Sequence, residues 1–186
     1  EFQQIKSPKH FHQSHHLSHA AAAFQTSPFG RATVVVIDAI GEWDTISIYA
    51  AEFTRAGKAT YKELWKQRYP NSIGLFYTAA TKKVGLRPLD EEYILMGMAG
   101  YGTATYELAM MDTLIADQYS ATFTQNLHLG FDDNFPVPNS KVKEVEFNIA
   151  ASAQKVAERL IRQVMRKAAS FNWSKNLAYS GGVALN

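Results

Sequence analysis

An unbroken apolar run, VVVI at residues 34–37, constrains the fold of this chain more than any other segment. β-Branched side chains favour extended backbone, and a run without polar alternation is typical of a strand that is buried on both faces. Residues 45–50 instead alternate polar and apolar side chains. This alternation predicts a half-buried strand, joined to the first by a turn at residues 39–43 in a β-hairpin.

Helical segments flank these strands in the sequence. Residues 149–170 give the clearest helix, because apolar side chains recur at three- and four-residue steps and basic residues occupy the opposite face. That basic face is interpreted as a solvated helix surface. We also predict an extended piece at 9–13, a loop at 124–142, a strand at 176–179, and helices over 15–25, 71–84, 91–99 and 105–116. The strands at 33–38, 44–51 and 175–179 are expected to share one sheet, with the 149–170 helix packed on one face.

Composition limits the kinds of site and partner. The 186 residues contain no cysteine, which excludes disulfides, thiolate metal sites and a cysteine nucleophile. The net charge of +2 makes nucleic acid an unlikely partner. No apolar run reaches the ~18 residues of a membrane span, so we expect a cytoplasmic protein without a membrane partner. The chain lacks an initiator Met and stops after a strand-to-helix turn, so it is expected to be a fragment.

The histidines are concentrated near the N-terminus, with five of the six in the first nineteen residues. On a helix, His15 and His19 are one turn apart on the same face and could bind one metal ion. His16 lies about 100° around the helix and is a poorer ligand. Neutral imidazole suits iron, zinc or copper, but a carboxylate or water must complete the site. The alternative is a polar helix end whose histidines bind no metal.

Three loops combine glycine with polar or acidic side chains. Glycine lets backbone N–H groups approach a phosphate, although such glycines are more often found in ordinary turns and at helix ends. No P-loop and no G-x-S-x-G elbow is present, and no catalytic residue is assigned. The candidates are Asp38, Gly41 and Glu42 in the first loop, Glu92 and Gly97 in the second, and Ser180, Gly181, Gly182 and Asn186 in the third.

The order of these motifs resembles the O-carbamoyltransferase family of nodulation protein U and the cephem carbamoyltransferases. The matching segments are HHLSHA at 15–20, D-x-x-G-E at 38–42, MGMA-x-YG at 96–102 and SGGVALN at 180–186. The resemblance runs over essentially the whole chain but covers only the middle of the family's first domain. It implies an α/β fold of the actin, Hsp70 and sugar-kinase class, which is RNase H-like. Residues 1–30 would end one half-domain with the histidine helix, and residues 31–186 would form most of the second.

The resemblance also implies an activity. Family members make carbamoyl-adenylate from carbamoyl phosphate and ATP, and pass the carbamoyl group to a hydroxyl of a small acceptor. The residues matching His15 and His19 would bind Fe²⁺ together with an aspartate beyond the last motif. The nucleotide would contact the three loops, at Asp38, Gly41, Glu42, Glu92, Gly97, Ser180, Gly181, Gly182 and Asn186.

The chain departs from the family pattern at a few positions. Ala39 stands where the family usually has glycine, Ile94 where it has lysine, and Gly100 where it has proline. The distal aspartate and the YrdC-like domain are absent from this sequence, so we expect the chain alone not to run the full reaction. Two alternatives stay open: a relative of the tRNA threonylcarbamoyl-transfer enzymes, and a non-catalytic nucleotide- or metal-binding module. Exposed sheet edges favour self-association, so a homodimer is also expected.

Overall fold

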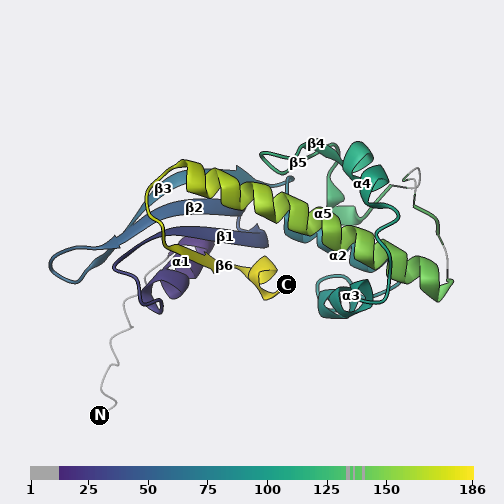
Figure 1. The fold of residues 1–186 in the computed structure, drawn as a ribbon, viewed down its shortest axis with the longest axis horizontal. Coiled ribbons are helices and arrows are strands. Elements are labelled where there is room, and N and C mark those ends of the chain that lie inside the picture. Colours follow the sequence, from purple (N-terminus) through teal and green to yellow (C-terminus); the bar gives the residue numbers. More distant parts are fainter. Residues whose placement is uncertain (1–12, 133–134, 136, 140) are drawn as a thin grey trace, which may run out of the picture.

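A four-stranded sheet forms the centre of the chain in the computed structural model, which describes residues 13–132, 135, 137–139 and 141–186 (Figure 1). Its strands lie in the order β3-β2-β1-β6. β2 is antiparallel to both β1 and β3, whereas β6 is parallel to β1. The prediction that the strands at 33–38, 44–51 and 175–179 share one sheet is therefore confirmed, and the observed sheet has a fourth strand, β3. Its strands are β1 (Arg31–Gly41), β2 (Asp44–Phe53), β3 (Ala59–Arg68) and β6 (Leu177–Ser180).

The edge strand β3 was not predicted from the sequence. Its side chains are half-buried or exposed, and two lysines, a glutamate and an arginine interrupt its apolar pattern. Charged residues on an edge strand reduce the risk of pairing with another chain. The same residues interrupt the alternation of polar and apolar side chains by which a strand is recognised in a sequence. β3 pairs with nine residues of β2, so the hairpin is long even though one of its strands is polar.

Five α-helices accompany the sheet in the described residues. They are α1 (His15–Gln25), α2 (Ile73–Lys83), α3 (Glu92–Ala99), α4 (Glu107–Leu114) and α5 (Lys143–Ser170). Two predictions were wrong at their ends. α5 begins at Lys143 rather than 149, and the segment predicted as helix to 116 leaves the helix at Leu114 and enters a short strand. The predicted extended piece at 9–13 lies almost wholly outside the described residues.

Short elements complete the chain. β4 (Ile115–Asp117) and β5 (Thr122–Phe123) form a separate two-stranded ribbon. Two 3₁₀ turns follow, η1 (Leu127–Leu129) and η2 (Gly182–Leu185). Neither turn was predicted as a helix, because a single 3₁₀ turn is too short to show a periodic pattern.

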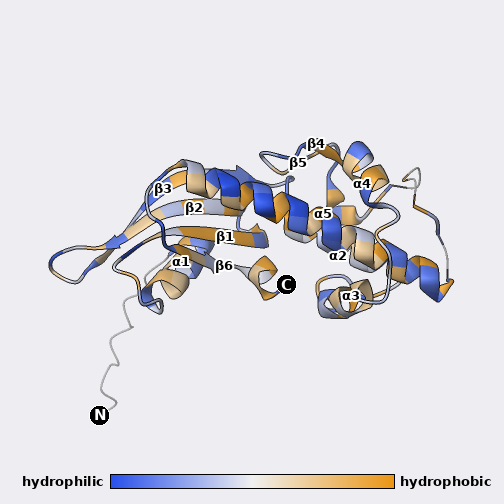
Figure 2. Cartoon of the chain, in the orientation of Figure 1, coloured by the Kyte–Doolittle hydropathy of each residue, from blue (hydrophilic) through white to orange (hydrophobic). Residues whose placement is uncertain are grey.

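Helices cover both faces of β1, as its unbroken apolar run requires. Val35 and Ile37 belong to the larger core, which includes α2 and α5, and this confirms the predicted packing of the long helix on one face. Val34 and Val36 point to the other face, where they join Phe24 of α1 in a smaller core. α5 follows the same division, because its buried residues are mostly apolar, and Figure 2 shows hydrophilic and hydrophobic residues alternating along this helix.

The mixed α/β class is confirmed, whereas the assignment to the actin-like class and the boundary at residue 30 stay predictions. Among the described residues, no helix has both the length and the apolar character needed to cross a membrane. The carboxyl ends of β1 and β6 meet at one edge of the sheet, and the start of α2 lies there too. Ser72, the N-cap of α2, accepts a hydrogen bond from Leu75 N at 3.0 Å and donates one to Ala39 O at 2.6 Å.

Candidate metal centre and adjoining pocket

Two histidines of α1 meet an aspartate at the carboxyl end of β1. His15 Nε2 lies 2.8 Å from Asp38 Oδ2, and His19 Nε2 lies 3.3 Å from the same oxygen. The two histidine Nε2 atoms are 3.1 Å apart. The helix is held in this register because Ala20 and Phe24, which lie on its buried face, pack against the sheet.

These three side chains fit a metal ion. Each offers one ligand atom, and the three atoms lie within 4.8 Å of one another. Two imidazoles and one carboxylate are the donor set that non-haem Fe²⁺ commonly takes, with open positions left for other ligands. The predicted pair His15 and His19 is thus joined by Asp38, which sequence analysis placed in a nucleotide loop. A carboxylate directly after a buried strand was the available signal, but no local spacing connects it to the helix.

Electrostatics favour an ionised Asp38 at this position. Burial alone would raise the pKa of its carboxyl group, but the hydrogen bonds from His15 and from Ala39 N, with attraction to both histidines, outweigh burial and lower it. Asp38 Oδ1 accepts the Ala39 N–H at 2.8 Å, which leaves Oδ2 directed at the histidines. The carboxylate is therefore charged and oriented as a metal ligand needs to be.

His16 is not one of these three side chains and is buried between α1 and the sheet. It is 1% exposed, and its Nδ1 lies 2.8 Å from Ser47 Oγ. Burial lowers the pKa of His16, so its ring is neutral at physiological pH. Within the described residues its Nε2 has no hydrogen-bond partner. The sequence prediction that His16 is a poorer ligand agrees with this burial on the sheet side of α1.

Gly41 and Glu42 lie beside the histidines rather than in the apolar pocket described below. A Cβ at Gly41 would fall within 3.0 Å of ring carbons of both His15 and His16. Glu42 has a left-handed backbone with φ 61° and borders a polar hollow. That hollow also contains Gln13, His15, Ser18 and His19. Gly41 and Glu42 of the first predicted loop thus lie near the histidines, whereas Asp38 of the same loop also lines the apolar pocket.

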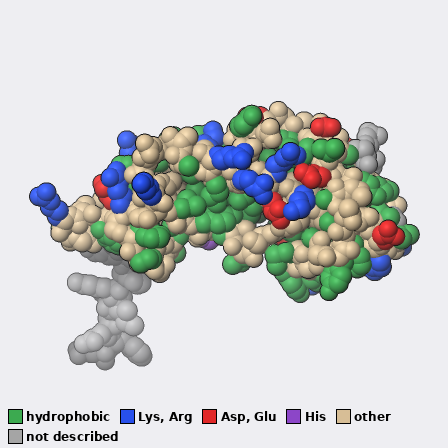
Figure 3. All heavy atoms as spheres, viewed as in Figure 1, with side chains coloured by type: hydrophobic (Ala, Val, Ile, Leu, Met, Phe, Trp, Pro, Cys, Tyr) green, Lys and Arg blue, Asp and Glu red, His purple; other side chains and the backbone are tan. Residues whose placement is uncertain are grey.

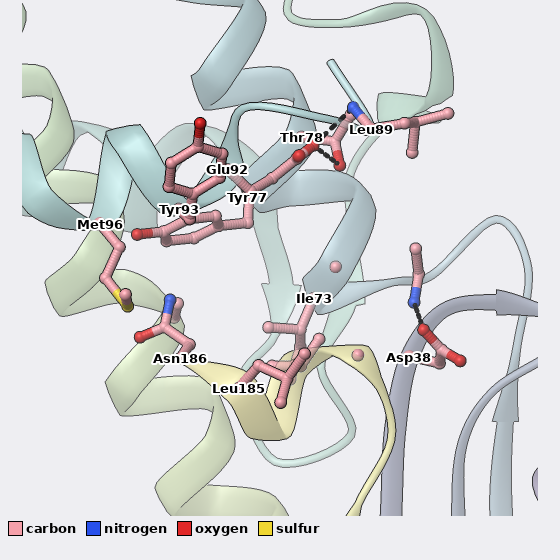
Figure 4. Close-up of a pocket in the computed structure, with 15 residues that line it drawn as sticks. Asp38, Ile73, Tyr77, Thr78, Leu89, Glu92, Tyr93, Met96, Leu185 and Asn186 are labelled. Carbon is pink, nitrogen blue, oxygen red and sulfur yellow. Dashed lines mark hydrogen bonds between the residues drawn. The ribbon is translucent and has the colours of Figure 1, made fainter. Parts of the chain in front are cut away.

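An apolar pocket of about 400 Å³ has Asp38 among its lining residues (Figure 4). Figure 4 shows Asp38 at one end and Tyr77, Met96 and Asn186 at the opposite end. The lining is mainly apolar, from α2, α3 and the last residues of the chain. Its members include Ala39, Ile73, Gly74, Tyr77, Thr78, Leu89, Tyr93, Met96, Val183 and Leu185.

Four of the nine residues predicted to contact a nucleotide line this pocket: Asp38, Glu92, Gly182 and Asn186. Glu92 Oε1 accepts hydrogen bonds from Thr78 Oγ1 and Leu89 N, which fixes α3 beside α2. Gly97, Ser180 and Gly181, like Gly41 and Glu42, are not among the lining residues. Gly181 has φ 98°, and a Cβ there would clash with the carbonyl oxygen of Ile37, so glycine allows β6 to turn close to β1.

Sequence analysis missed the hydrogen-bonded wall of the pocket. Tyr77 Oη donates to Gln154 Oε1 at 2.8 Å, and Gln154 Nε2 donates to Asn186 Oδ1 at 2.7 Å. This chain of contacts connects α2, α5 and the C-terminal turn. Burial raises the pKa of Tyr77 to about 12, so its phenol stays protonated and available as a donor. The residues lie 77 and 32 positions apart, a separation at which no sequence pattern predicts contact.

The geometry defines an α/β domain with a two-histidine, one-carboxylate cluster between an apolar pocket and a polar hollow. Comparison with known sequences assigns its family: the chain belongs to the carbamoyltransferase N-terminus family, whose model matches residues 1–186. The resemblance stated from the motifs is therefore confirmed.

Three relatives illustrate the similarity. An uncharacterized Synechocystis protein is 34% identical over 188 residues, covering 92% of this chain and 30% of that protein. Nodulation protein NolNO of Sinorhizobium fredii is 29% identical over 187 residues, covering 93% of this chain and 25% of NolNO. An uncharacterized Methanocaldococcus jannaschii protein is 26% identical over 196 residues, covering 100% of this chain and 36% of that protein. The chain thus spans about a third or less of the length of these relatives.

Proposed function

We propose that this chain forms part of a carbamoyltransferase that passes a carbamoyl group from carbamoyl-adenylate, made from carbamoyl phosphate and ATP, to a hydroxyl of a small acceptor. Membership of the carbamoyltransferase N-terminus family supports carbamoyl transfer. The observation that carries the proposal is the position of His15, His19 and Asp38 between the apolar pocket and the polar hollow.

The apolar pocket suits the nucleoside part of the donor. Its volume of about 400 Å³ and the faces of Ile73, Tyr77 and Met96 can receive a flat heteroaromatic ring. Asp38 and Gly182 lie at the other end, where the reacting group of an adenylate would be placed. A Cβ at Gly182 would be 2.8 Å from Asp38 Oδ1, so glycine keeps this approach open.

His15, His19 and Asp38 would hold Fe²⁺, the proposed cofactor, through two imidazole nitrogens and a carboxylate oxygen. When bound, the ion would supply Lewis acidity that stabilises negative charge on a carbonyl oxygen. The hydrogen bond from Ala39 N keeps the Asp38 carboxylate in one orientation. Gly41 allows α1 to approach the end of β1 closely, because the rings of His15 and His16 pack directly on this glycine.

The transfer step balances as an acyl substitution. The acceptor oxygen bonds to the carbamoyl carbon, the bond from that carbon to the adenylate phosphate oxygen breaks, and AMP leaves with the electron pair. The hydroxyl proton passes to a base or to water on the acceptor side. We place the acceptor in the polar hollow, because the two histidines line it and it shares no lining residue with the apolar pocket.

Calorimetry tests the two halves of the site separately. Under anaerobic conditions we expect Fe²⁺ to bind to the chain and Asp38→Asn to weaken it at least tenfold, whereas His128→Ala, outside the cluster, leaves it unchanged. ATP binding should be weakened by Gly182→Val but not by Gly97→Ala, since Gly97 does not line the pocket. Transfer of the ¹⁴C-labelled carbamoyl group from carbamoyl phosphate to a neutral acceptor is then measured with the intact native protein that contains this sequence. Fe²⁺ binding insensitive to Asp38→Asn, or no transfer, would contradict the proposal.

A further inference from the structure

A chain of hydrogen bonds that begins on α5 fixes the side chain of Asn186, which lines the apolar pocket. The first member is Glu158, whose carboxylate can only accept hydrogen bonds. Glu158 Oε2 accepts one from Lys155 Nζ at 3.1 Å, and Glu158 Oε1 accepts one from Gln154 Nε2 at 3.3 Å. The carboxylate therefore determines how the Gln154 amide is oriented, with Nε2 toward Glu158 and Oε1 away from it.

The orientation of Gln154 in turn sets that of Asn186. Gln154 Oε1 accepts a hydrogen bond from the Tyr77 hydroxyl at 2.8 Å, and Gln154 Nε2 donates one to Asn186 Oδ1 at 2.7 Å. Because Asn186 Oδ1 is held by Gln154, the amide nitrogen of Asn186 must face the other way. Figure 4 shows this nitrogen on the side of Tyr77 and Met96, at the end of the pocket opposite Asp38.

The acidity of Tyr77 agrees with this orientation of Asn186. Burial raises the pKa of the phenol to about 12, and a hydrogen bond with the Asn186 side chain partly opposes the rise. A hydrogen bond lowers the pKa of a phenol when it stabilises the phenolate, so the group that faces Tyr77 is an N–H donor. An amide nitrogen carries two N–H groups, and one contact with Tyr77 leaves a second that can donate to a bound molecule.

A donor at the wall of an apolar pocket discriminates between orientations of a bound ring. Contact with apolar side chains alone favours burial of a flat ring and does not fix how its edge is turned. The ring nitrogens of a purine accept hydrogen bonds at particular points of that edge. The ring orientation that brings such a nitrogen to the Asn186 N–H is therefore favoured over the others.

We propose that Gln154, oriented by Glu158, is a positioning residue that holds the Asn186 amide with its N–H groups toward the purine ring of the bound nucleotide. Asn186 then donates to a ring nitrogen, which fixes the base while the rest of the nucleotide extends toward Asp38. Gln154 is not among the lining residues, so it acts through Asn186. This inference rests on the proposed function for the identity of the ligand, and it adds how the orientation of the base is determined.

Nucleotide analogues test the positioning with the intact native protein that contains this sequence. Calorimetry measures the dissociation constants of ATP and of 1-deaza-ATP, 3-deaza-ATP and 7-deaza-ATP, in each of which a C–H group replaces one ring nitrogen. We expect at least one analogue to bind about fivefold or more weakly than ATP, because it cannot accept the hydrogen bond from Asn186. The ratio of its dissociation constant to that of ATP is the readout for the variants.

Exchange of two side chains on α5 reverses the direction of the hydrogen bonds without changing composition or net charge. In the double variant Gln154→Glu, Glu158→Gln, the carboxylate at position 154 accepts from Asn186 Nδ2, so Asn186 Oδ1 turns toward the base. We expect the ratio to fall to within about twofold of one, both in this double variant and in Gln154→Ala, where the Asn186 amide is no longer held. Gln163→Glu is the matched control, because Gln163 is also on α5 but accepts from Arg166 outside the pocket, and it should keep the ratio. A purely structural loss would weaken ATP and its analogues by the same factor and leave the ratio unchanged.

Each outcome bears on the inference. Equal affinity for ATP and all three analogues would overturn it, and so would a ratio that survives both the exchange and Gln154→Ala. Absence of ATP binding would contradict the inference and the proposed function together. A ratio that is lost in the double variant, in a protein that transfers no carbamoyl group, would support the positioning while the proposed function fails. Carbamoyl transfer without discrimination among the analogues would support the proposed function and overturn the positioning.

Discussion

Gly41→Ala is the substitution that tests most directly how the chain positions the candidate metal ligands. Gly41 is buried at the end of β1, and a Cβ there would fall within 3.0 Å of ring carbons of His15 and His16. The buried His16 ring cannot move freely, and the His15 ring can move only by leaving its contact with Asp38. His16 is 1% exposed and bound to Ser47, and His15 is directed at Asp38. The added methyl must therefore displace α1, its histidines or the strand.

The expected cost follows from two terms. Overpacking a buried position typically costs about 1–3 kcal/mol. Loss of the His16–Ser47 hydrogen bond adds about 1 kcal/mol. A destabilisation of about 2–4 kcal/mol should lower Tm by roughly 4–16 °C in a chain of this size. Displacement of the histidines should also weaken Fe²⁺ binding about 10- to 100-fold, as changes around metal ligands commonly do.

Thermal unfolding and anaerobic calorimetry measure both effects, with Gly30→Ala as the matched control. Gly30 is exposed, and a Cβ there meets no atom within 4 Å. We expect Gly30→Ala to change the free energy of unfolding by less than about 0.5 kcal/mol and to leave Fe²⁺ affinity unchanged. If Gly41→Ala melts within 1 °C of Gly30→Ala and binds Fe²⁺ equally well, the close packing of histidine on glycine does not position the site.

Four further substitutions have distinct expected effects. Ser72→Ala should lower the free energy of unfolding, measured in urea, by about 1–2 kcal/mol, because the hydroxyl of this buried N-cap both donates and accepts a hydrogen bond. Ser14→Ala, at the more exposed N-cap of α1, should cost less. Equal losses in the two variants would contradict the reasoning. Burial raises the pKa of Tyr77 to about 12 in the folded chain, against 10.0 for an unperturbed tyrosine. The contribution of this shift to the free energy of unfolding is therefore complete below about pH 10 and is lost as the pH rises toward 12. Wild type should therefore lose up to about 2–3 kcal/mol more than Tyr77→Phe over this range. At neutral pH, Tyr179→Phe should be tolerated better than Tyr77→Phe, because the Tyr179 hydroxyl is buried without a partner among the described residues; a larger loss would show a contact that these residues do not contain. Gly181→Ala should disrupt the turn after β6 and lower Tm by several degrees, and an unchanged Tm would refute the steric argument.

The distribution of basic side chains on the surface bears on how the basic face of α5 is interpreted. Lysines and arginines gather over α5 and β3 on the face shown in Figure 3. Several of them are already paired, including Arg159 with Glu107 and Lys155 with Glu158. Lys167 Nζ lies 4.5 Å from the centroid of the Trp65 ring. This pairing agrees with the interpretation of the basic helix face as a solvated surface.

Local sequence was sufficient for the features that depend on neighbours along the chain. The apolar run of β1 and the three- and four-residue steps of α5 each reflect the geometry of one element, so each was predicted. The alternation over residues 45–50 predicted the strand β2, but the prediction that it is half-buried was wrong: residues 45–51 are all buried, because one face of β2 joins the larger core and the other joins the core with α1. The placement of His15 and His19 on one face also follows from the helical repeat alone. β3 escaped prediction because an edge strand with charged side chains lacks such a repeat.

Tertiary structure decided which residues share a site. Asp38 reaches the histidines from 19 and 23 positions away only because α1 packs across the face of β1. Because of the same packing, Gly41 lies against the rings of His15 and His16 and does not line the apolar pocket. The hairpin turn brings the Trp43 ring next to that of Tyr69. Sequence patterns record the periodicity of single helices and strands. Distances between elements depend on how their faces pack, and one sequence carries no direct measure of that packing.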